Sequence, residues 1–284
     1  MKQILTFFVV VLLVGGCSTN EPLPPPGPLV EVPKCSEVQG KGMQPSCIAR
    51  RGDPNSQQKA LVIGNANYDY SPLQNPINDA KAMTDALVNL EFHVTRVTNL
   101  DGRRMKGVVE DFKSSLPHQG VALFYFSGHG AQVNGENFLL PVNNKQIRRQ
   151  QDLKGKAVSA QNVLAMMQDA NEGVNLLVLD ACRNNPYRGS EKSSNPPGLA
   201  SMDSPRGSLI AFATAPGQVA LDGDGYNGLY TSHLLDALEN AKNKRIEDVF
   251  LEVQNPVIKK SNGKQEPWYQ ASFREAFCIG GCSQ

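Results

Sequence analysis

Apolar runs of strand length alternate along the chain with longer segments in which apolar residues recur at helical spacing. Most runs are apolar at successive positions, which is typical of strands covered by helices on both faces of a parallel sheet. The predicted strands span residues 59–65, 121–127, 174–180 and 208–214, with a more polar one at 93–100.

The segments between these strands predict helices. Asn75 and Pro76 supply a cap and a first-turn proline, and an apolar stripe with helical spacing follows from Ile77 to Leu90. Further helices are expected at residues 101–115, 159–170, 229–240 and 246–260. The alternation indicates an α/β fold, with a doubly wound, mostly parallel sheet sandwiched by helices. Ligands of such sheets bind beyond the carboxyl ends of the strands.

Composition divides the chain into four parts. Residues 1–17 combine a lysine with an apolar core too short to span a membrane, which is the layout of an export signal. Residues 18–58 are rich in proline, glycine and polar side chains, which predicts a flexible tether. Residues 59–277 are enough for one domain with a full core, and residues 278–284 form a cysteine-containing tail.

The export signal ends in Val-Gly-Gly-Cys, which resembles a bacterial lipobox. That resemblance implies that Cys17 is lipidated and becomes the mature N-terminus; an unmodified cysteine at a signal boundary is the alternative. Ser18 follows, as in the sorting pattern of Gram-negative lipoproteins of the outer membrane. We therefore expect a lipid-anchored protein of the bacterial cell envelope, on the outer membrane and facing the periplasm.

Six cysteines are present, and four of them remain once Cys17 and Cys182 are set aside for their special positions. An even number in an exported, oxidising compartment predicts disulfides. The four are Cys35, Cys47, Cys278 and Cys282. They allow three pairings, which the sequence leaves open. A zinc site is disfavoured because their spacing is not compact.

Two of the predicted strands are followed directly by reactive side chains. The strand at 121–127 leads into Gly-His-Gly, which contains His129, and the strand at 174–180 leads into Ala-Cys, which contains Cys182. Because parallel strands end at one sheet edge, the imidazole can face the thiol and stabilise its thiolate. The backbone N–H groups of Gly130 and Cys182 are candidates for an oxyanion site. A surface histidine and an inert buried cysteine are the alternative, which the pairing disfavours.

The motifs FSGHG and LDACRNNP resemble those of caspase-type cysteine peptidases, the clan of caspases, metacaspases and paracaspases. In caspases the Q-A-C-[RQG]-G box follows the catalytic histidine by about 50 residues. The resemblance covers residues 59–275 and is closest to bacterial caspase-like proteins. It implies that His129 is the general base or imidazolium partner. Cys182 would be the nucleophile that forms a thioester, with no third triad member.

The chain departs from caspases in the pocket for the P1 side chain. Asp180 stands where caspases carry a glutamine that helps to bind acidic P1 residues, and metacaspases carry Asp there. The resemblance to metacaspases adds Asp79 to this pocket. Alignment of PGQVALD with a caspase motif puts Asp222 in the place of an arginine. Together they imply an S1 pocket for Arg or Lys, although each Asp alone is also a common turn residue.

The resemblance therefore implies an endopeptidase that cleaves polypeptides after basic P1 residues. A catalytically weak peptide-binding module is one alternative, which the retention of both His129 and Cys182 disfavours. A cysteine amidase acting at the cell envelope is the other. Residues 183–206 lack a helix or strand pattern, so they are either a linker cleaved for activation, as in caspases, or a permanent flap.

No cofactor is expected. Metacaspases often need Ca²⁺, but residues 222–228 lack the acidic spacing of an EF-hand loop, so a calcium site there is disfavoured. The net charge is +1 with dispersed Lys and Arg, which argues against a nucleic-acid partner. The sequence gives no indication of the oligomeric state.

Overall fold

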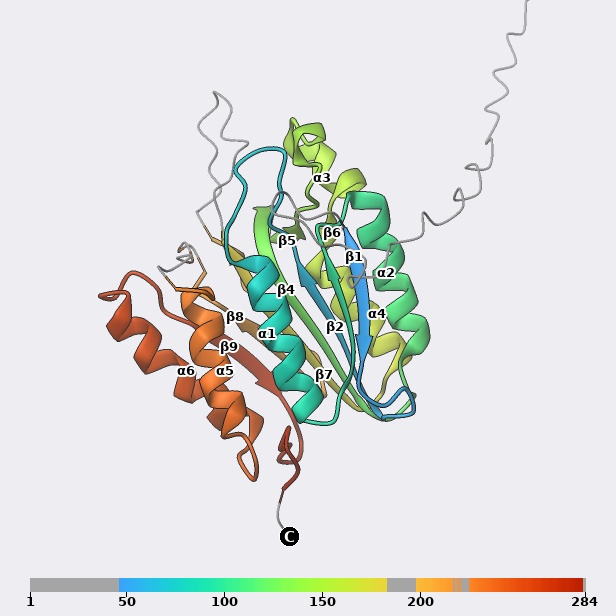
Figure 1. Cartoon of the computed structure of the whole chain (residues 1–284), viewed down its shortest axis with the longest axis vertical. Coiled ribbons are helices and arrows are strands. Elements are labelled where there is room, and N and C mark those ends of the chain that lie inside the picture. Colours follow the sequence, from blue (N-terminus) through green and yellow to red (C-terminus); the bar gives the residue numbers. More distant parts are fainter. Residues whose placement is uncertain (1–45, 183–197, 217, 219, 221–224, 283–284) are drawn as a thin grey trace, which may run out of the picture.

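A computed structural model describes residues 46–182, 198–216, 218, 220 and 225–282. A central sheet lies between helices on both faces (Figure 1). The strands are β1 (Cys47–Arg51), β2 (Gln58–Gly64), β3 (His93–Thr98), β4 (Val121–Val133), β5 (Glu136–Leu139), β6 (Val158–Ser159), β7 (Val174–Cys182), β8 (Ser208–Phe212) and β9 (Trp268–Ser272). The helices are α1 (Pro76–Asn89), α2 (Gly102–Ser115), η2 (Asn144–Gln146), α3 (Gln150–Lys156), α4 (Ala160–Ala170), α5 (Leu229–Glu239) and α6 (Ile246–Lys260).

The main sheet has the strand order β1-β3-β2-β4-β7-β8-β9. Its five central strands run parallel, and β1 and β9 pair with its two edges in the antiparallel direction. The small strands β5 and β6 extend the far end of β4. The predicted doubly wound, mostly parallel α/β sandwich is confirmed.

Two hydrophobic layers hold the helices to the sheet. One face is packed by α1, α5 and α6, and the other by α2 and α4. In α1 the predicted apolar stripe is buried at Ala80, Met83 and Leu87. Full burial of each large apolar side chain stabilises the fold by about 2 kcal/mol, so this stripe fixes the helix against the sheet.

The start of α1 lies unusually close to the end of β2. A Cβ atom on Gly64 would lie 2.2 Å from the Pro76 carbonyl oxygen and 2.8 Å from the Ala80 Cβ. Only glycine permits this approach. The close packing brings the first turn of α1, which carries Asp79, to the carboxyl edge of the sheet.

Ordered structure continues beyond the expected domain, residues 59–277, at both ends. Residues 47–51 were expected to lie in the tether, but they form β1, which pairs with β3 from Cys47↔Thr98 to Arg51↔Val94. The free edge of β3 supplies the hydrogen-bond partners of β1, and a sequence as short as that of β1 does not predict a strand by itself. In the expected tail, Ile279 is 2% exposed and belongs to the core beside α5 and α6.

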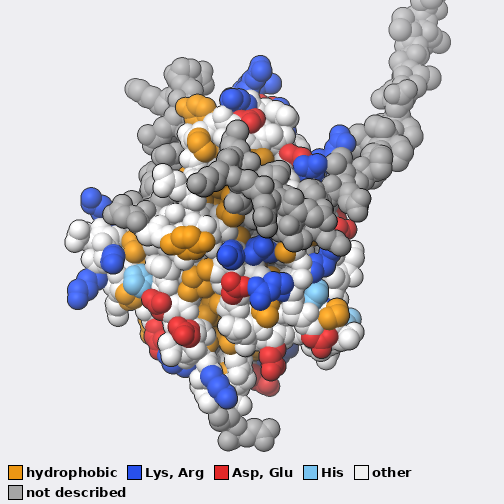
Figure 2. Space-filling view, viewed as in Figure 1, with side chains coloured by type: hydrophobic (Ala, Val, Ile, Leu, Met, Phe, Trp, Pro, Cys, Tyr) orange, Lys and Arg blue, Asp and Glu red, His pale blue; other side chains and the backbone are white. Residues whose placement is uncertain are grey.

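The sequence pattern also missed four short elements, namely β5, β6, β9 and α3. The described part of the chain contains no helix with the length and hydropathy needed to cross a bilayer. On the face shown in Figure 2, Lys and Arg side chains lie at separate places with Asp and Glu between them. This mixture fits the net charge of +1.

Candidate active site

Strands β4 and β7 are parallel neighbours at the centre of the sheet. Their register places Ser127 opposite Asp180, Gly128 opposite Ala181 and His129 opposite Cys182. Neighbouring strands lie about 4.8 Å apart. The structure therefore brings the predicted histidine and cysteine positions together, although both lie within their strands and not just beyond them. β4 extends further than predicted because it continues to pair with β5, and β7 extends because it continues to pair with β4.

The imidazole of His129 is buried, with 4% of the residue exposed, and it has a defined hydrogen bond. Its Nε2 atom lies 2.6 Å from the backbone carbonyl oxygen of Ser71. A carbonyl oxygen only accepts, so Nε2 carries the proton in this arrangement. In the neutral ring, Nδ1 is then the nitrogen that can accept a proton.

The Ser71 carbonyl was not predicted from the sequence, since every residue carries one. Ser71 has a φ of +57° in the loop between β2 and α1, and polar contacts hold this loop in place. Asn99 Oδ1 accepts from the N–H groups of Ala66 and Asn67, each at 3.0 Å. Asn144 accepts from the Tyr70 N–H at 2.9 Å and donates to its carbonyl at 2.8 Å.

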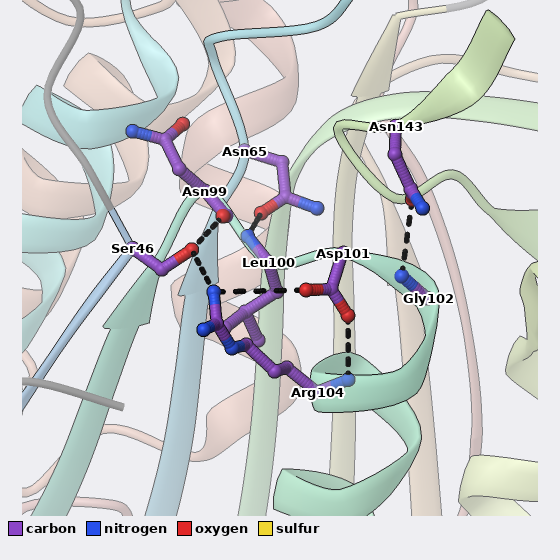
Figure 3. Close-up of polar contacts among 8 residues, drawn as sticks. All are labelled: Ser46, Asn65, Asn99, Leu100, Asp101, Gly102, Arg104 and Asn143. Carbon is purple, nitrogen blue, oxygen red and sulfur yellow. Dashed lines mark hydrogen bonds and ion pairs between the residues drawn. The ribbon is translucent and has the colours of Figure 1, made fainter. Parts of the chain in front are cut away.

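Further polar contacts hold residues 99–102, the segment whose Asn99 side chain contacts this loop (Figure 3). Asn65 Oδ1 accepts from the Leu100 N–H at 2.9 Å, and Ser46 donates to the Asn99 carbonyl. Asn143 accepts from the Gly102 N–H at 3.1 Å. These asparagine side chains satisfy backbone groups that no strand or helix pairs. The carbonyl that orients His129 is therefore part of a well-supported segment.

Gly130, a predicted oxyanion donor, lies opposite Leu139 on β5. The Leu140 N–H donates to the His129 carbonyl at 2.9 Å, so His129 and Leu140 occupy a hydrogen-bonded position. Positions alternate in an antiparallel pair, and the Gly130 N–H therefore points away from β5. A Cβ on Gly130 would lie 3.0 Å from Leu199 Cδ2 and 3.2 Å from Ala181 Cβ, which leaves little room for a side chain.

Asp79, one of the predicted S1 residues, is 2% exposed, and three groups within the described part of the chain donate to it. Ser127 Oγ donates to its Oδ2 at 3.0 Å. Asn227 Nδ2 and the Gly228 N–H donate to its Oδ1 at 3.0 and 2.9 Å. The carboxylate thus joins α1, β4 and the start of α5.

Asp180, the second predicted S1 residue, is 7% exposed and accepts from Thr231 Oγ1 at 2.5 Å. The Tyr125 hydroxyl lies 2.5 Å from the same Thr231 oxygen. Because Thr231 gives its proton to the carboxylate, Tyr125 donates to Thr231. Burial, together with the nearby charges of Asp79 and Asp180, raises the pKa of Tyr125 well above its usual value, so this donor stays protonated.

The two carboxylates lie in one polar cluster, made of Asp79, Ser127, Asp180 and Thr231. Burial and the charge of Asp180 also raise the pKa of Tyr230 well above its usual value. Asp222, the third predicted S1 residue, lies outside the described residues, as do Cys17, Cys35 and most of residues 183–206. Thr231 was not predicted, because a threonine within an amphipathic helix gives no distinct signal.

Cys278 and Cys282 form a disulfide, which is one of the pairs that the sequence left open, and Cys47 is also disulfide-bonded. Within the described ranges, no group of three or more His, Cys, Asp or Glu residues is arranged to hold a metal ion. The calcium site that the sequence disfavours would lie in residues 222–228, of which 222–224 are outside the described residues.

The fold and the paired histidine and cysteine positions are those expected of a caspase-type cysteine peptidase. A family model described as the caspase domain, peptidase family C14, matches residues 57–278. The chain belongs to this family.

Two curated relatives share the same region. The mucosa-associated lymphoid tissue lymphoma translocation protein 1 of Homo sapiens is 28% identical over 222 residues, which cover 76% of this chain and 26% of that protein. Its Mus musculus homolog is 27% identical over 214 residues, which cover 73% of this chain and 25% of that protein. The chain thus corresponds to about a quarter of the length of each relative.

Proposed function

We propose that the protein is a cysteine endopeptidase that cleaves polypeptides after Arg or Lys through a dyad of His129 and Cys182. The observation that carries the proposal is the register of β4 and β7, which sets these two residues directly opposite each other at the carboxyl edge of the sheet. Membership of the caspase-domain family supports the same chemistry.

In the proposed reaction, His129 Nδ1 accepts the thiol proton and Cys182 attacks the carbonyl carbon of the scissile peptide bond. The N–H groups of Gly130 and Cys182 stabilise the oxyanion of the tetrahedral intermediate. The imidazolium then protonates the leaving amine, which departs and leaves a thioester. Water hydrolyses the thioester with His129 as base. The hydrogen bond from Nε2 to the Ser71 carbonyl stabilises the imidazolium between these steps.

We further propose that Asp79, Asp180 and Asp222 make the S1 pocket anionic. The burial of Asp79 and Asp180 in one cluster beside the dyad strands supports this proposal. A guanidinium group can bind a carboxylate through two hydrogen bonds, so Arg should be preferred to Lys. An acidic P1 side chain would meet like charge in a poorly solvated pocket.

The test is a panel of fluorogenic peptides that differ only at P1, assayed with and without Ca²⁺ and after treatment with a thiol alkylator. We expect alkylator-sensitive cleavage after Arg and Lys, without a requirement for Ca²⁺. Hydrolysis of small envelope amides but of no peptide would favour the amidase. Peptide binding without turnover would favour the binding module, and either result would overturn the endopeptidase proposal.

We also propose that the mature protein is lipid-anchored through Cys17 in the bacterial outer membrane, facing the periplasm, which the lipobox-like Val-Gly-Gly-Cys supports. The Cys17→Ser variant should remain an unprocessed precursor or lose its lipid. Membrane fractionation and mass spectrometry of the N-terminal peptide check this. Processed Cys17→Ser protein that still fractionates with membranes would contradict the anchor.

A further inference from the structure

The Tyr68 hydroxyl lies between the His129 N–H of β4 and the carbonyl of Leu140, the residue that follows β5. These two backbone groups would otherwise bond directly. The Tyr68 hydroxyl accepts a hydrogen bond from the His129 N–H at 2.7 Å and donates to the Leu140 carbonyl oxygen at 3.2 Å. His129 and Leu140 occupy a hydrogen-bonded position, in which two strands normally exchange two direct bonds. Here the Leu140 N–H makes one direct bond to the His129 carbonyl, and the Tyr68 hydroxyl bridges the other pair.

Gly128, which precedes His129, leaves room for the Tyr68 hydroxyl. A Cβ atom on Gly128 would lie 2.4 Å from the Tyr68 hydroxyl oxygen and 2.9 Å from the Phe126 ring. A side chain at Gly128 would therefore displace the hydroxyl or the strand. The Gly-His-Gly motif permits a tyrosine to approach the histidine backbone from the adjoining loop.

Tyr68 also contacts the histidine side chain. The two ring centroids are 4.4 Å apart at an interplanar angle of 47°, and Tyr68 is 3% exposed. The loop that carries Tyr68 also carries Ser71, whose carbonyl accepts from His129 Nε2. One loop thus contacts His129 at its backbone N–H, its ring face and its Nε2 atom.

We propose that Tyr68 is a positioning residue for His129, in that its hydroxyl holds the strand backbone and its ring holds the imidazole. The proposal rests on the proposed function of His129 as the base of the dyad. Without the hydroxyl, the buried His129 N–H loses its acceptor. The strand would recover a bond by closing directly onto Leu140, and that movement would carry the imidazole away from its working position.

The experiment compares Tyr68→Phe with Tyr70→Phe, which removes a hydroxyl from an exposed tyrosine of the same loop. With a P1-Arg peptide, Tyr68→Phe should lower kcat between about tenfold and a hundredfold, because small misplacements of catalytic groups cost rates of this order. KM should change by less than about twofold, since Tyr68 acts through His129 and not on bound substrate. Tyr70→Phe should match the wild type in both constants.

A second experiment measures the rate at which iodoacetamide alkylates Cys182 as a function of pH. Mass spectrometry of the peptide that contains Cys182 gives the extent of alkylation. A well-placed imidazolium favours the thiolate, so Tyr68→Phe should shift the profile to higher pH, towards that of His129→Ala. This assay needs no peptidase turnover. If wild type and His129→Ala have the same profile, the dyad itself fails and Tyr68 has no catalytic group to position.

If those two profiles differ but Tyr68→Phe follows the wild type with unchanged kcat, the dyad stands and the positioning role is overturned. A folding defect is recognised from the thermal midpoint and the near-ultraviolet circular dichroism of Tyr68→Phe. In that case Gly128→Ala, which crowds the hydroxyl and keeps the tyrosine, provides the alkylation profile. A wild-type profile in a folded Gly128→Ala protein would likewise overturn the proposal.

Discussion

The amino ends and the carboxyl ends of the parallel strands, here called the amino edge and the carboxyl edge of the sheet, bury different kinds of polar side chain. At the amino edge, Asn171 accepts from the N–H groups of Gly120 and Gly173 and donates to the Gly120 and Val174 carbonyls. That neutral amide closes turns of the backbone. The carboxyl edge instead buries titratable groups, among them His129 and Asp79.

This difference suggests that polar residues at the amino edge stabilise the fold, whereas those at the carboxyl edge take part in the proposed reaction. Buried neutral amides with satisfied hydrogen bonds stabilise turns at modest cost, whereas burying an ionisable group is costly unless its surroundings stabilise it. Proteins retain such groups mainly where they act. Changes at the carboxyl edge should therefore alter activity most, and changes at the amino edge should alter stability alone.

The largest expected effect is the loss of the dyad. Cys182→Ala and His129→Ala should each lower kcat/KM by roughly ten-thousandfold or more, because either change disables the same nucleophile unit. The thermal midpoint of Cys182→Ala should stay close to that of the wild type, whereas His129→Ala also removes a buried, hydrogen-bonded imidazole and should lower the midpoint. Steady-state kinetics and calorimetry measure both quantities. Wild-type turnover by Cys182→Ala would end the dyad hypothesis.

The second largest expected effect concerns the preference of the enzyme for one P1 side chain over another. The kcat/KM of the wild type should be about a thousandfold higher for P1-Arg than for P1-Asp peptides, because an acidic side chain would meet like charge in the proposed S1 pocket. Asp180→Asn and Asp222→Asn should each lower P1-Arg cleavage, by about a hundredfold for Asp180. Asp236→Asn is the matched control, because this side chain on α5 is 76% exposed.

Two results would contradict the predicted S1 pocket. One is efficient P1-Asp cleavage by the wild type, and the other is unchanged P1-Arg cleavage in both the Asp180 and Asp222 variants. Either result would leave the dyad hypothesis intact, because the register that pairs His129 with Cys182 does not depend on the carboxylates.

The central sheet could be predicted because its strands are apolar on both faces and lie between amphipathic helices. The same pattern predicted that His129 and Cys182 lie near each other, since the carboxyl ends of parallel strands meet at one side of a sheet. Edge strands lack this signal. In β1 and β9 all residues except Cys47 remain at least partly exposed, so their sequences do not differ from loops.

The surroundings of the site were harder to predict, because they depend on groups without a sequence signature. Ser71 contributes a backbone carbonyl, which any residue offers. Thr231 and Tyr68 act through single hydroxyls whose partners are distant in the sequence. Asp79 was expected in the S1 pocket, and its hydrogen bonds with Ser127, Asn227 and Gly228 could be seen only in the folded structure.

Asp79 should therefore matter for stability as well as specificity. Asp79→Ala leaves Ser127, Asn227 and the Gly228 N–H without this acceptor, and we expect the free energy of unfolding to fall by about 3 kcal/mol. Urea denaturation checks this value, with Asp236→Ala as the exposed control. A loss below about 1 kcal/mol would show that the start of α5 is held by its apolar contacts instead.

The smallest expected effect lies at the amino edge. Cys278 and Ile279 line a cavity of about 910 Å³ together with Gln58 and Val121, the first residues of β2 and β4. This places the Cys278–Cys282 disulfide at the edge opposite His129. Alkylation without reduction should label Cys182 and leave Cys278 and Cys282 unlabelled, whereas labelling of all three would contradict the bridge.

The double variant Cys278→Ala/Cys282→Ala should lower the free energy of unfolding by about 2 kcal/mol, the chain-entropy value for so short a loop. The buried Ile279 still anchors the end of the chain in the core, so the fold should persist. The kcat/KM for a P1-Arg peptide should remain within about twofold of wild type, because the altered bond lies at the other edge of the sheet. A larger loss of activity at unchanged stability would show that the two edges are coupled.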